Sequence, residues 1–297
     1  MDIERKLDIK ASGQGFSGRF QAMGSPCELL SEAGTRQEAE RLVGIAAAEA
    51  WRIEDKFSRY LDGNIVDRIN KGAGQSIAVD AETAQLLDFA DTLYELSERA
   101  FDITSGTLRR AWTFDGSDNL PLQEDISALL NAVGWEKVDW NAPNLTLLPG
   151  MEIDLGGIGK EYAVDRVILE LRQQGDTPCL VNFGGDLAVT GPPGKRRAWT
   201  VGIESEVFGG AEKLIELQQG ALATSGDARR YLQKEGIRYS HVLDPRTGWP
   251  VADAASSITV AADSCTQAGM LATLAMLKGP SAEQFLDDQA EQYWCRR

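Results

Sequence analysis

The chain has 297 residues, of which 43% are hydrophobic and 25% are charged, the composition of a globular protein rather than of a disordered one. Its 45 acidic and 30 basic residues give a formal charge of −15, which argues against unspecific attraction to DNA, RNA or anionic lipid surfaces. A ligand that carries phosphate is not excluded, because it needs only a local patch of amide groups and a cation.

Helices are predicted in the first part of the chain. Residues 36–60 place apolar side chains at helical spacing, with charged residues between them. Residues 81–99 show a broader apolar face, and Asp80 is placed to cap that helix. After a middle segment rich in Gly, Asn and Pro, a third helix is expected over residues 159–173.

Short β-type runs dominate the second half and are separated by turn sequences rich in Gly, Pro and Asp. Ser264 followed three residues later by Gln267 is a capping-box pattern, which predicts a helix to about Leu277, and another helix is expected after Pro280. The predicted helices cluster early in the chain, the predicted strands cluster late, and there is no regular βα alternation. This order predicts an α+β fold. The β-type runs are CLVNF, AWTVGIES, KLIELQQGALATS, SHVLD and SSITVAA.

The cysteines suggest no zinc centre, and no segment has the length of a membrane span. Cys27, Cys179, Cys265 and Cys295 are widely spaced and accompanied by a single histidine, so we expect buried small residues rather than a zinc site. No apolar stretch approaches the roughly 20 residues of a membrane span. The first residues lack the continuous apolar segment of a secretory signal, so we expect a cytoplasmic protein as written, or a periplasmic one if an export leader was removed.

One glycine-rich segment, DLGGIGK from Asp154 to Lys160, has the composition of a phosphate-binding turn. A Walker A loop would need glycine at Asp154 and Ser or Thr at Glu161, and no GxGxxG follows a predicted strand, so both of those loops are excluded. What remains is a tight turn feeding a helix N-terminus, whose N–H groups can reach phosphate oxygens. From this segment alone, a purely conformational turn is an equal alternative.

Eight segments together resemble, in type, order and approximate spacing, the signature blocks of the ApbE family of flavin transferases. The resemblance runs from about residue 19 to 279. It implies an N-terminal extension over 1–18 and a single domain over 19–297, with mixed, largely antiparallel sheets and helices packed on them. The segments are FQAMGSPCEL (20–29), FSRYLDGNIVDRIN (57–70), AFDITSGTL (100–108), EIDLGGIGKEYAVDRV (152–167), CLVNFGGDLAVTG (179–191), ALATSGD (221–227), HVLDPRTGWPV (241–251) and ITVAADSCTQAGMLATLAML (258–277).

The resemblance implies a binding site for FAD. Met23 is expected against the flavin, and Tyr60 is expected to stack on or flank an aromatic ring of FAD. For each aromatic or apolar residue, packing in the core is the alternative. The other FAD-binding positions implied by the family are Ala100, Phe101, Asp102, Asp154, Lys160 and Leu243.

The implied reaction is phosphoryl transfer. A Thr or Ser hydroxyl on another protein attacks the FMN-side phosphorus of FAD, AMP leaves, and FMN stays joined through a phosphoester. His241, the only histidine, matches a family residue beside the scissile pyrophosphate, where a neutral imidazole could accept the hydroxyl proton. Asp244 could orient that ring or the turn. A histidine that is merely packed or exposed is the alternative.

The family also implies a magnesium ion, held by the backbone carbonyl of Gly157 and the hydroxyl of Thr273. The last signature block of the family usually reads A-D-x-x-A-T, with the Asp one helical turn before the Thr. In this chain Thr273 matches the Thr, but Gly269 stands in place of the Asp and provides no carboxylate. A second departure is Glu161, where the family commonly has glycine. Gly269→Asp is therefore expected to restore the ligand pair and to favour the helix modestly. The missing oxygen could come from water, from the substrate phosphates, or from Asp263, Asp227 or Glu161.

Three functions stay open on these residues: an FAD:protein FMN transferase, a non-catalytic FAD-binding protein, and an FAD pyrophosphatase that releases FMN and AMP. The transferase implies a target protein with a Ser/Thr flavinylation motif, such as a subunit of a membrane redox complex or a soluble reductase. No nucleic-acid partner and no integral membrane segment are expected.

Overall fold

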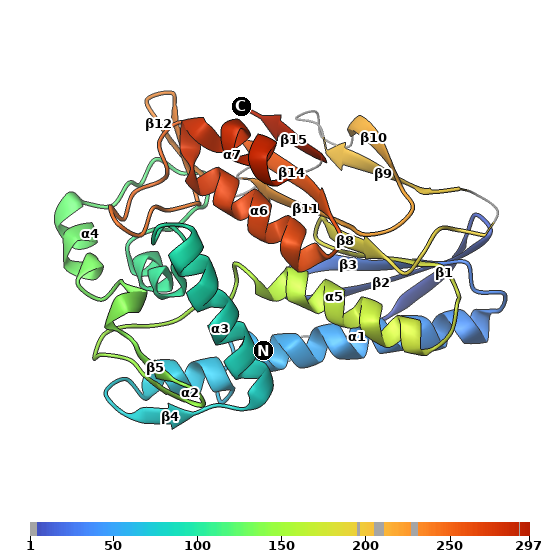
Figure 1. The fold of residues 1–297 in the computed structure, drawn as a ribbon, viewed down its shortest axis with the longest axis horizontal. Coiled ribbons are helices and arrows are strands. Elements are labelled where there is room, and N and C mark those ends of the chain that lie inside the picture. Colours follow the sequence, from blue (N-terminus) through green and yellow to red (C-terminus); the bar gives the residue numbers. More distant parts are fainter. Residues whose placement is uncertain (1–4, 195–196, 205–210, 227–230, 291) are drawn as a thin grey trace.

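An eight-stranded sheet forms the centre of the structure (Figure 1), a computed structural model that describes residues 5–194, 197–204, 211–226, 231–290 and 292–297. Its order is β1-β2-β3-β7-β8-β11-β14-β15, and each neighbouring pair is antiparallel. The antiparallel sheet and the helices beside it confirm the predicted α+β class. The strands are β1 (Asp8–Ser12), β2 (Gly15–Ala22), β3 (Ser25–Ser31), β7 (Cys179–Phe183), β8 (Asp186–Val189), β11 (Ala221–Gly226), β14 (Ser257–Ala262) and β15 (Gln292–Arg296).

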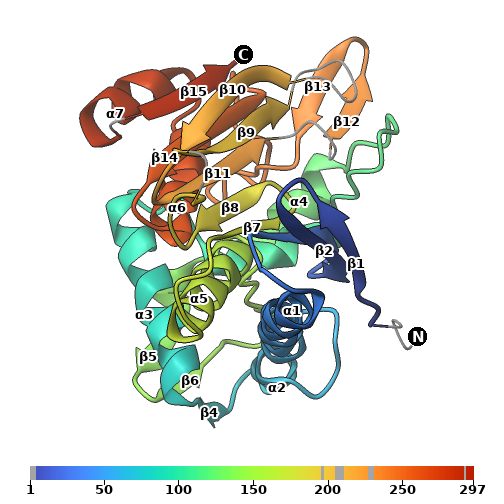
Figure 2. The same cartoon turned by 90° about the vertical axis from the view of Figure 1, so that its right-hand side faces the viewer.

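Three helices cover one face of this sheet: α1 (Arg36–Phe57), α5 (Gly159–Gln173) and α6 (Cys265–Leu277). Alternate side chains of β7 show how the two faces divide, because successive residues of a strand point to opposite sides. Cys179, Val181 and Phe183 join the core under the helices, whereas Leu180 joins a second cluster against the hairpin β9 (Trp199–Glu204) and β10 (Ala211–Leu217). Figure 2 shows this hairpin well away from α1 and α5.

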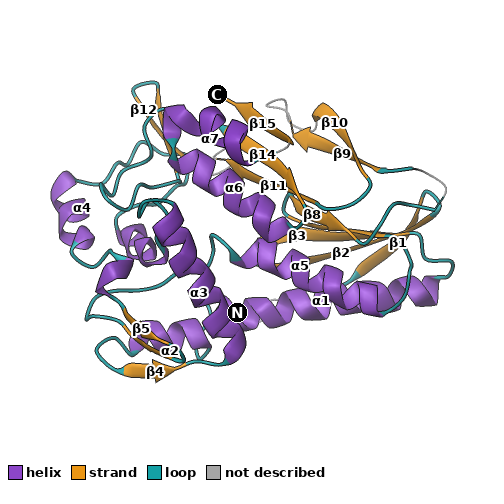
Figure 3. Cartoon of the chain, viewed as in Figure 1, coloured by secondary structure: helices purple, strands orange, loops and turns teal. Residues whose placement is uncertain are grey.

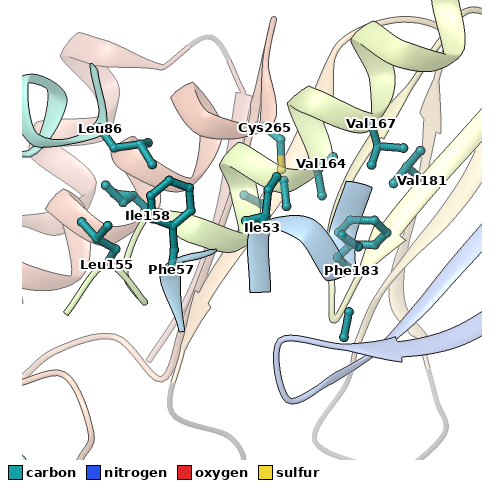
Figure 4. Packing of buried hydrophobic residues seen from close by; sticks show 14 of the residues in the cluster. Ile53, Phe57, Leu86, Leu155, Ile158, Val164, Val167, Val181, Phe183 and Cys265 are labelled. Atoms are coloured by element: carbon teal, nitrogen blue, oxygen red, sulfur yellow. The ribbon is translucent and has the colours of Figure 1, made fainter. Parts of the chain in front are cut away.

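The core beneath the helices fixes where α5 begins. Figure 4 shows side chains from α1, α5 and β7 meeting between the layers, including Ile53, Phe57, Val164 and Phe183. All four are 6% exposed or less, so their burial supplies the main hydrophobic stabilisation of this region. Ile158, directly before α5, is buried in the same cluster and anchors the glycine-rich turn to it.

Smaller elements gather at the end of the molecule on the left of Figure 3. A three-stranded sheet in the order β4-β6-β5 lies there with short helices. The remaining elements are α2 (Ile65–Lys71), β4 (Ser76–Ala78), α3 (Ala81–Leu96), the 3₁₀ helix η1 (Ile103–Arg110), α4 (Gln123–Leu130), η2 (Trp135–Lys137), β5 (Asp139–Asn141), β6 (Asn144–Thr146), β12 (Tyr231–Lys234), β13 (Ile237–Ser240), η3 (Gly279–Ser281) and α7 (Ala282–Gln289).

The predicted helices are confirmed, with the predicted caps in place. Asp80 accepts hydrogen bonds from the N–H groups of Glu82 and Thr83 at the start of α3. Ser264 accepts one from the N–H of Gln267, at 3.2 Å, at the start of α6. None of the helices in the described part of the chain is long and apolar enough to cross a membrane.

Two strand predictions were wrong in part. The run KLIELQQGALATS is two strands, because Gly220 turns the chain with a φ of 79° between β10 and β11. The run SHVLD forms no continuous strand: β13 ends at Ser240, and Leu243 makes only a single bridge to Pro250. The following turn draws the chain back, since the Asp244 N–H donates to the Trp249 carbonyl.

The N-terminal strands were not predicted, so the expectation that strands cluster late was also wrong. Residues 8–18, expected to be part of an extension, supply β1 and the beginning of β2 to the edge of the central sheet. Glycine in this stretch resembles a turn signal, but at Gly18 it serves close packing. A Cβ there would lie 2.2 Å from a methyl carbon of Val43 on α1.

The cysteines lie largely as expected. All four are free thiols; Cys27, Cys179 and Cys265 are buried, and Cys295 is partly buried.

Candidate active site

A tight turn feeds α5, as the glycine-rich segment predicted. The Leu155 carbonyl accepts hydrogen bonds from the N–H groups of Ile158 and Gly159, at 3.1 and 2.9 Å. The Asp154 carboxylate accepts one from the Gly156 N–H at 2.9 Å. The N-cap residue of α5, Ile158, gives no side-chain cap to this helix end. The positive end of a four-turn helix is therefore open to an anionic ligand.

Two arginines join Tyr60 to Asp154. Arg109 donates a hydrogen bond to the Tyr60 hydroxyl and forms an ion pair with the Asp154 carboxylate at 3.1 Å. Arg59 approaches the same carboxylate at 3.5 Å and forms an ion pair with Glu152 at 3.0 Å. Tyr60 is 76% exposed, so most of its ring is accessible to a ligand. Two residues predicted at FAD are thus brought together around a cationic pair.

The segment with Ala100, Phe101 and Asp102 lies against the glycine turn, but all three residues are buried. A Cβ added at Gly157 would lie 3.3 Å from Cε2 of Phe101, so the ring packs directly against this glycine. Asp102 accepts bonds from the N–H and hydroxyl of Thr104, at 2.7 and 2.6 Å, and from the Trp135 N–H at 3.0 Å. Burial raises the pKa of Asp102, against these hydrogen bonds, which lower it. Asp102 therefore organises the wall behind the turn.

Lys160 is held by a carboxylate that the sequence did not identify as important. Its Nζ lies 2.5 Å from Oδ2 of Asp186, a residue only 1% exposed at the start of β8. The other oxygen of Asp186 accepts a bond from the Thr224 N–H on β11, at 3.3 Å. Burial alone would lower the pKa of Lys160, but the Asp186 and Glu161 carboxylates raise it above its ordinary value. The cation therefore stays charged at neutral pH beside the open end of α5.

Glu161 is buried between α5 and α6. It is 9% exposed, and its Oε2 finds no hydrogen-bond partner among the described residues. A Cβ built at Gly269 would lie 2.5 Å from Cγ and 2.8 Å from Oε1 of Glu161. Burial, followed by the charge of Asp186, raises the pKa of Glu161 to about 8. The two departures from the family pattern are thus in contact, and the glutamate fills the space beside the glycine.

The other residues considered for the metal lie as follows. Thr273 is partly buried on α6, one turn after Gly269 and on the same side of the helix. Asp263 is exposed before the cap of α6, and Asp227 lies outside the described residues. In the described ranges, no three His, Cys, Asp or Glu side chains come together to hold a metal. Carbonyl, hydroxyl and phosphate oxygens would therefore complete any magnesium site here.

His241 lies in an aromatic cluster beside the first half of the chain. Its ring meets that of Phe114 edge to face, with centroids 6.3 Å apart and an interplanar angle of 73°. Trp112 stacks on Phe114 and donates its indole N–H to the Gly248 carbonyl at 2.8 Å. Leu108 of η1 packs in this cluster, directly before Arg109. The short helix η1 therefore connects the histidine loop to the Tyr60 and Asp154 pair.

Asp244 serves the turn that follows His241. Its carboxylate accepts bonds from the Arg246 N–H at 2.9 Å and from that guanidinium at 2.9 and 2.8 Å. Burial raises the pKa of Asp244, but these bonds outweigh it and hold the pKa below its usual value. Of the two roles predicted for Asp244, the geometry supports orientation of the turn.

Met23 and Leu243 lie in different surroundings. Met23 occupies the tight turn between β2 and β3, with a φ of 53°, and its N–H donates to Glu54 at 2.6 Å. Leu243 is partly buried against the aromatic cluster of His241. The contacts thus form one group around the start of α5, with Tyr60, Phe101, Asp154, Lys160 and Glu161, and a second around His241 and Leu243.

Sequence reasoning missed three residues of the first group: Asp186, Arg59 and Arg109. The signal for Asp186 was a carboxylate directly after two glycines in NFGGD, at the turn between two apolar runs. The arginines carried no signal, because Arg59 reaches Asp154 across 95 residues of the sequence and Arg109 reaches Tyr60 across 49.

Comparison with known proteins identifies the family of this chain. The sequence profile described as "ApbE family" matches residues 23–294. An FAD:protein FMN transferase of Vibrio cholerae is 32% identical over 76% of this chain and 70% of its own length. One from Haemophilus influenzae is 30% identical over 74% of this chain and 68% of its own.

Solved structures agree. The ApbE protein of Thermotoga maritima superposes with a TM-score of 0.83 at 29% identity, covering 98% of this chain and 94% of its own. The apo flavinyl transferase ApbE of Pseudomonas stutzeri gives 0.80 at 26% identity, covering 100% and 97%. The profile and the solved structures span nearly the whole chain, and the two relatives match about three quarters of it, so the chain belongs to the ApbE family.

Proposed function

We propose that this protein transfers FMN from FAD to a Thr or Ser hydroxyl of a target flavoprotein and releases AMP. The observation that carries the proposal is the open N-terminus of α5, with the Lys160 cation beside it. Such a site suits the two phosphates of FAD, since helix N–H groups and a lysine both favour phosphate oxygens. The names of the relatives above support the same reaction.

The surroundings of α5 suit the rest of the FAD molecule. The exposed ring of Tyr60, flanked by Arg59 and Arg109, offers a stacking surface for an aromatic ring. Phe101 and the hydrogen bonds of Asp102 support the glycine turn from behind, so the backbone that would hold the phosphates is fixed in position. Accurate positioning accounts for much of the catalysis in phosphoryl transfer, where the enzyme makes few covalent bonds.

His241 is proposed as the base that accepts the proton of the attacking hydroxyl. Its ring is held by Phe114 in a loop whose turn is tied down by Asp244 and Arg246. This loop packs on η1 through Leu108, and η1 also bears Arg109, so this short helix links the proposed base to the group around Tyr60 and Asp154. The hydroxyl oxygen then bonds to the FMN-side phosphorus as the bond to the AMP oxygen breaks.

Magnesium fits the residues present. A hard cation of this kind takes oxygen ligands and commonly shares them with substrate phosphates. The Gly157 carbonyl, the Thr273 hydroxyl and a carboxylate would hold it, and it would neutralise charge on the pyrophosphate. The observation that supports the fit is the buried Oε2 of Glu161, which finds no hydrogen-bond donor in the described chain.

Flavin fluorescence on a denaturing gel tests the proposal. The protein is incubated with FAD, magnesium and a target domain with a Ser/Thr flavinylation motif, taken from a redox-complex subunit or a reductase. We expect flavin that stays on the target after denaturation, and transfer slower by on the order of a hundredfold in His241→Asn. FAD affinity, titrated separately, should change little in this variant. Unchanged transfer would show that another group activates the hydroxyl.

A further inference from the structure

The carboxylate of Glu161 is a feature of the α5–α6 junction that hydrophobic packing does not explain. A buried ionisable group is costly unless it is paired or binds a cation. Glu161 is 9% exposed, and its Oε2 has no hydrogen-bond partner among the residues described. An apolar side chain would fill the same space without that cost. The site therefore retains an oxygen that is ready to accept a ligand.

The Glu161 carboxylate lies where the family usually has the aspartate that Gly269 replaces in this chain. The side chain of Glu161 occupies the space into which a residue at 269 would project, because Cγ lies 2.5 Å from a Cβ built at Gly269. Thr273 follows Gly269 by one turn on the same side of α6, and Gly157 lies four residues before Glu161, in the turn that precedes α5. The Glu161 carboxylate thus contacts α6 at Gly269, one turn before the Thr273 hydroxyl and one turn after Gly157 along its own segment.

We propose that Glu161 is the metal-binding carboxylate of this protein, supplied from α5 instead of from position 269 of α6. This inference rests on the proposed function and assigns the ligand that function requires. The pair Glu161 and Gly269 acts as a unit: the glutamate provides the oxygen, and the glycine leaves room for it. A glycine at 269 is then a requirement of the site rather than a lost ligand.

The sequence-based expectation for Gly269→Asp is corrected accordingly. The new side chain would overlap Glu161, since Cγ and Oε1 both lie closer than 3.0 Å to the new Cβ. It would also place a second carboxylate beside a buried one, which disfavours ionisation of both. The single substitution should weaken folding and should not improve metal binding.

Direct Mn²⁺ binding tests the assignment without relying on activity. Free Mn²⁺ is measured by electron paramagnetic resonance in titrations of the full chain, with and without saturating FAD. We expect Glu161→Gln, which keeps the shape of the side chain, to weaken Mn²⁺ binding by at least about tenfold. Glu82→Gln, a change of the same kind in the first turn of α3, is the matched control and should bind Mn²⁺ like the wild type.

A double variant that moves the carboxylate from position 161 to position 269 tests whether Glu161 has only a structural role. Glu161→Ala should lose Mn²⁺ affinity, and the double variant Glu161→Ala/Gly269→Asp should recover most of it, because the carboxylate returns from the other helix. Equal Mn²⁺ affinity in Glu161→Gln and wild type, or no recovery in a folded double variant, would overturn the assignment. FAD affinity is followed in each variant: loss of Mn²⁺ binding with FAD binding retained supports the assignment, whereas a wild type that binds neither contradicts the proposed function itself.

Discussion

Two glutamates, Glu82 and Glu161, stand in the first turns of two helices but in opposite surroundings. Glu82 accepts hydrogen bonds from Arg52 at 2.7 and 2.8 Å, from Lys56 at 2.6 Å and from the Tyr162 hydroxyl at 2.8 Å. These donors, Arg52 first, lower its pKa to about 2. Glu161 is more deeply buried, and its Oε2 has no donor in the described structure, so burial raises its pKa to about 8.

The difference in hydrogen bonding indicates different roles: Glu82 stabilises the fold, and Glu161 is available to a ligand. The bonds of Glu82 tie α1, α3 and α5 together, and its oxygens have no capacity left for a ligand. Glu161 contributes nothing comparable to folding, because its ionisation is opposed by burial. A buried carboxylate oxygen without a hydrogen-bond donor in the described part of the chain, beside the turn proposed to hold the phosphates, is what we expect of the metal ligand proposed above.

The largest effect should appear in the transfer rate at limiting magnesium. Glu161→Gln is expected to transfer FMN about tenfold to a hundredfold more slowly than the wild type, because the metal loses an anionic ligand. Glu82→Gln should remain near the wild-type rate. Initial transfer rates of both variants are measured across a magnesium titration. Equal decreases in rate in Glu161→Gln and Glu82→Gln would show that the two glutamates do not differ in this way.

Alanine at two helical glycines should have effects of opposite sign on stability. A Cβ at Gly269 meets Glu161, so Gly269→Ala should cost about 1–3 kcal/mol through overpacking. Gly44, within α1, has no atom within 4 Å of its added Cβ, so Gly44→Ala should stabilise by about 0.5–1 kcal/mol.

Urea denaturation measures both changes. Repeating Gly269→Ala in a Glu161→Ala background should remove most of the cost. A cost that persists there would mean that something other than Glu161 fills the space.

Loss of the Glu82 network should lower stability modestly. Arg52 is 40% exposed on its side chain, so solvent weakens the pair, and Glu82→Gln should cost about 1 kcal/mol in urea denaturation. Glu161→Gln should cost no stability in metal-free protein, because it removes a buried ionisable group. A larger loss in Glu161→Gln than in Glu82→Gln would reverse our assignment of their roles.

The two glutamates should also give opposite pH dependences in metal-free protein. The folded-state pKa of Glu82 lies below the ordinary 4.5, so its stabilising contribution is complete above pH 4.5 and is lost as the pH falls toward 2. The folded-state pKa of Glu161 lies above 4.5, so its contribution is complete below pH 4.5 and is lost as the pH rises through about 8. The measurement is the urea denaturation midpoint of each Gln variant as a function of pH. Glu82→Gln should reduce the loss of stability at low pH, and Glu161→Gln should reduce the loss at high pH.

Local patterns predicted the helices and the tight turn before α5 well. Asp80, Ser264 and the periodic apolar residues of α1 and α3 act within a few residues of one another, so their effect is visible in the sequence. The strands β1–β3 were missed, and in β2 one reason is that Gly18 resembles a turn signal but is required by contact with Val43 on a later helix. The run at His241 was misjudged because a turn closed by Asp244 overrides its β propensity.

The site could be predicted only where the family resemblance reached. Tyr60, Asp154 and Lys160 were identified from motifs, and their roles toward FAD stay predictions. Asp186 was missed because its partner Lys160 lies 26 residues away, on a different element. Glu161 was one of several possible sources of the missing metal oxygen in the sequence. Its contact with Gly269 and its oxygen without a partner among the described residues, which favour it over the others, are visible only in the structure.

The most direct test of the transferase assignment is the ratio of AMP released to FMN attached to the target, measured by chromatography and intact-protein mass spectrometry in one reaction. Transfer predicts one AMP for each added FMN, with no accumulation of free FMN, and a strong dependence on magnesium. AMP formed together with free FMN, and a target of unchanged mass, would instead identify a pyrophosphatase. FAD bound but neither cleaved nor transferred to any target would contradict the account and leave a flavin-binding protein.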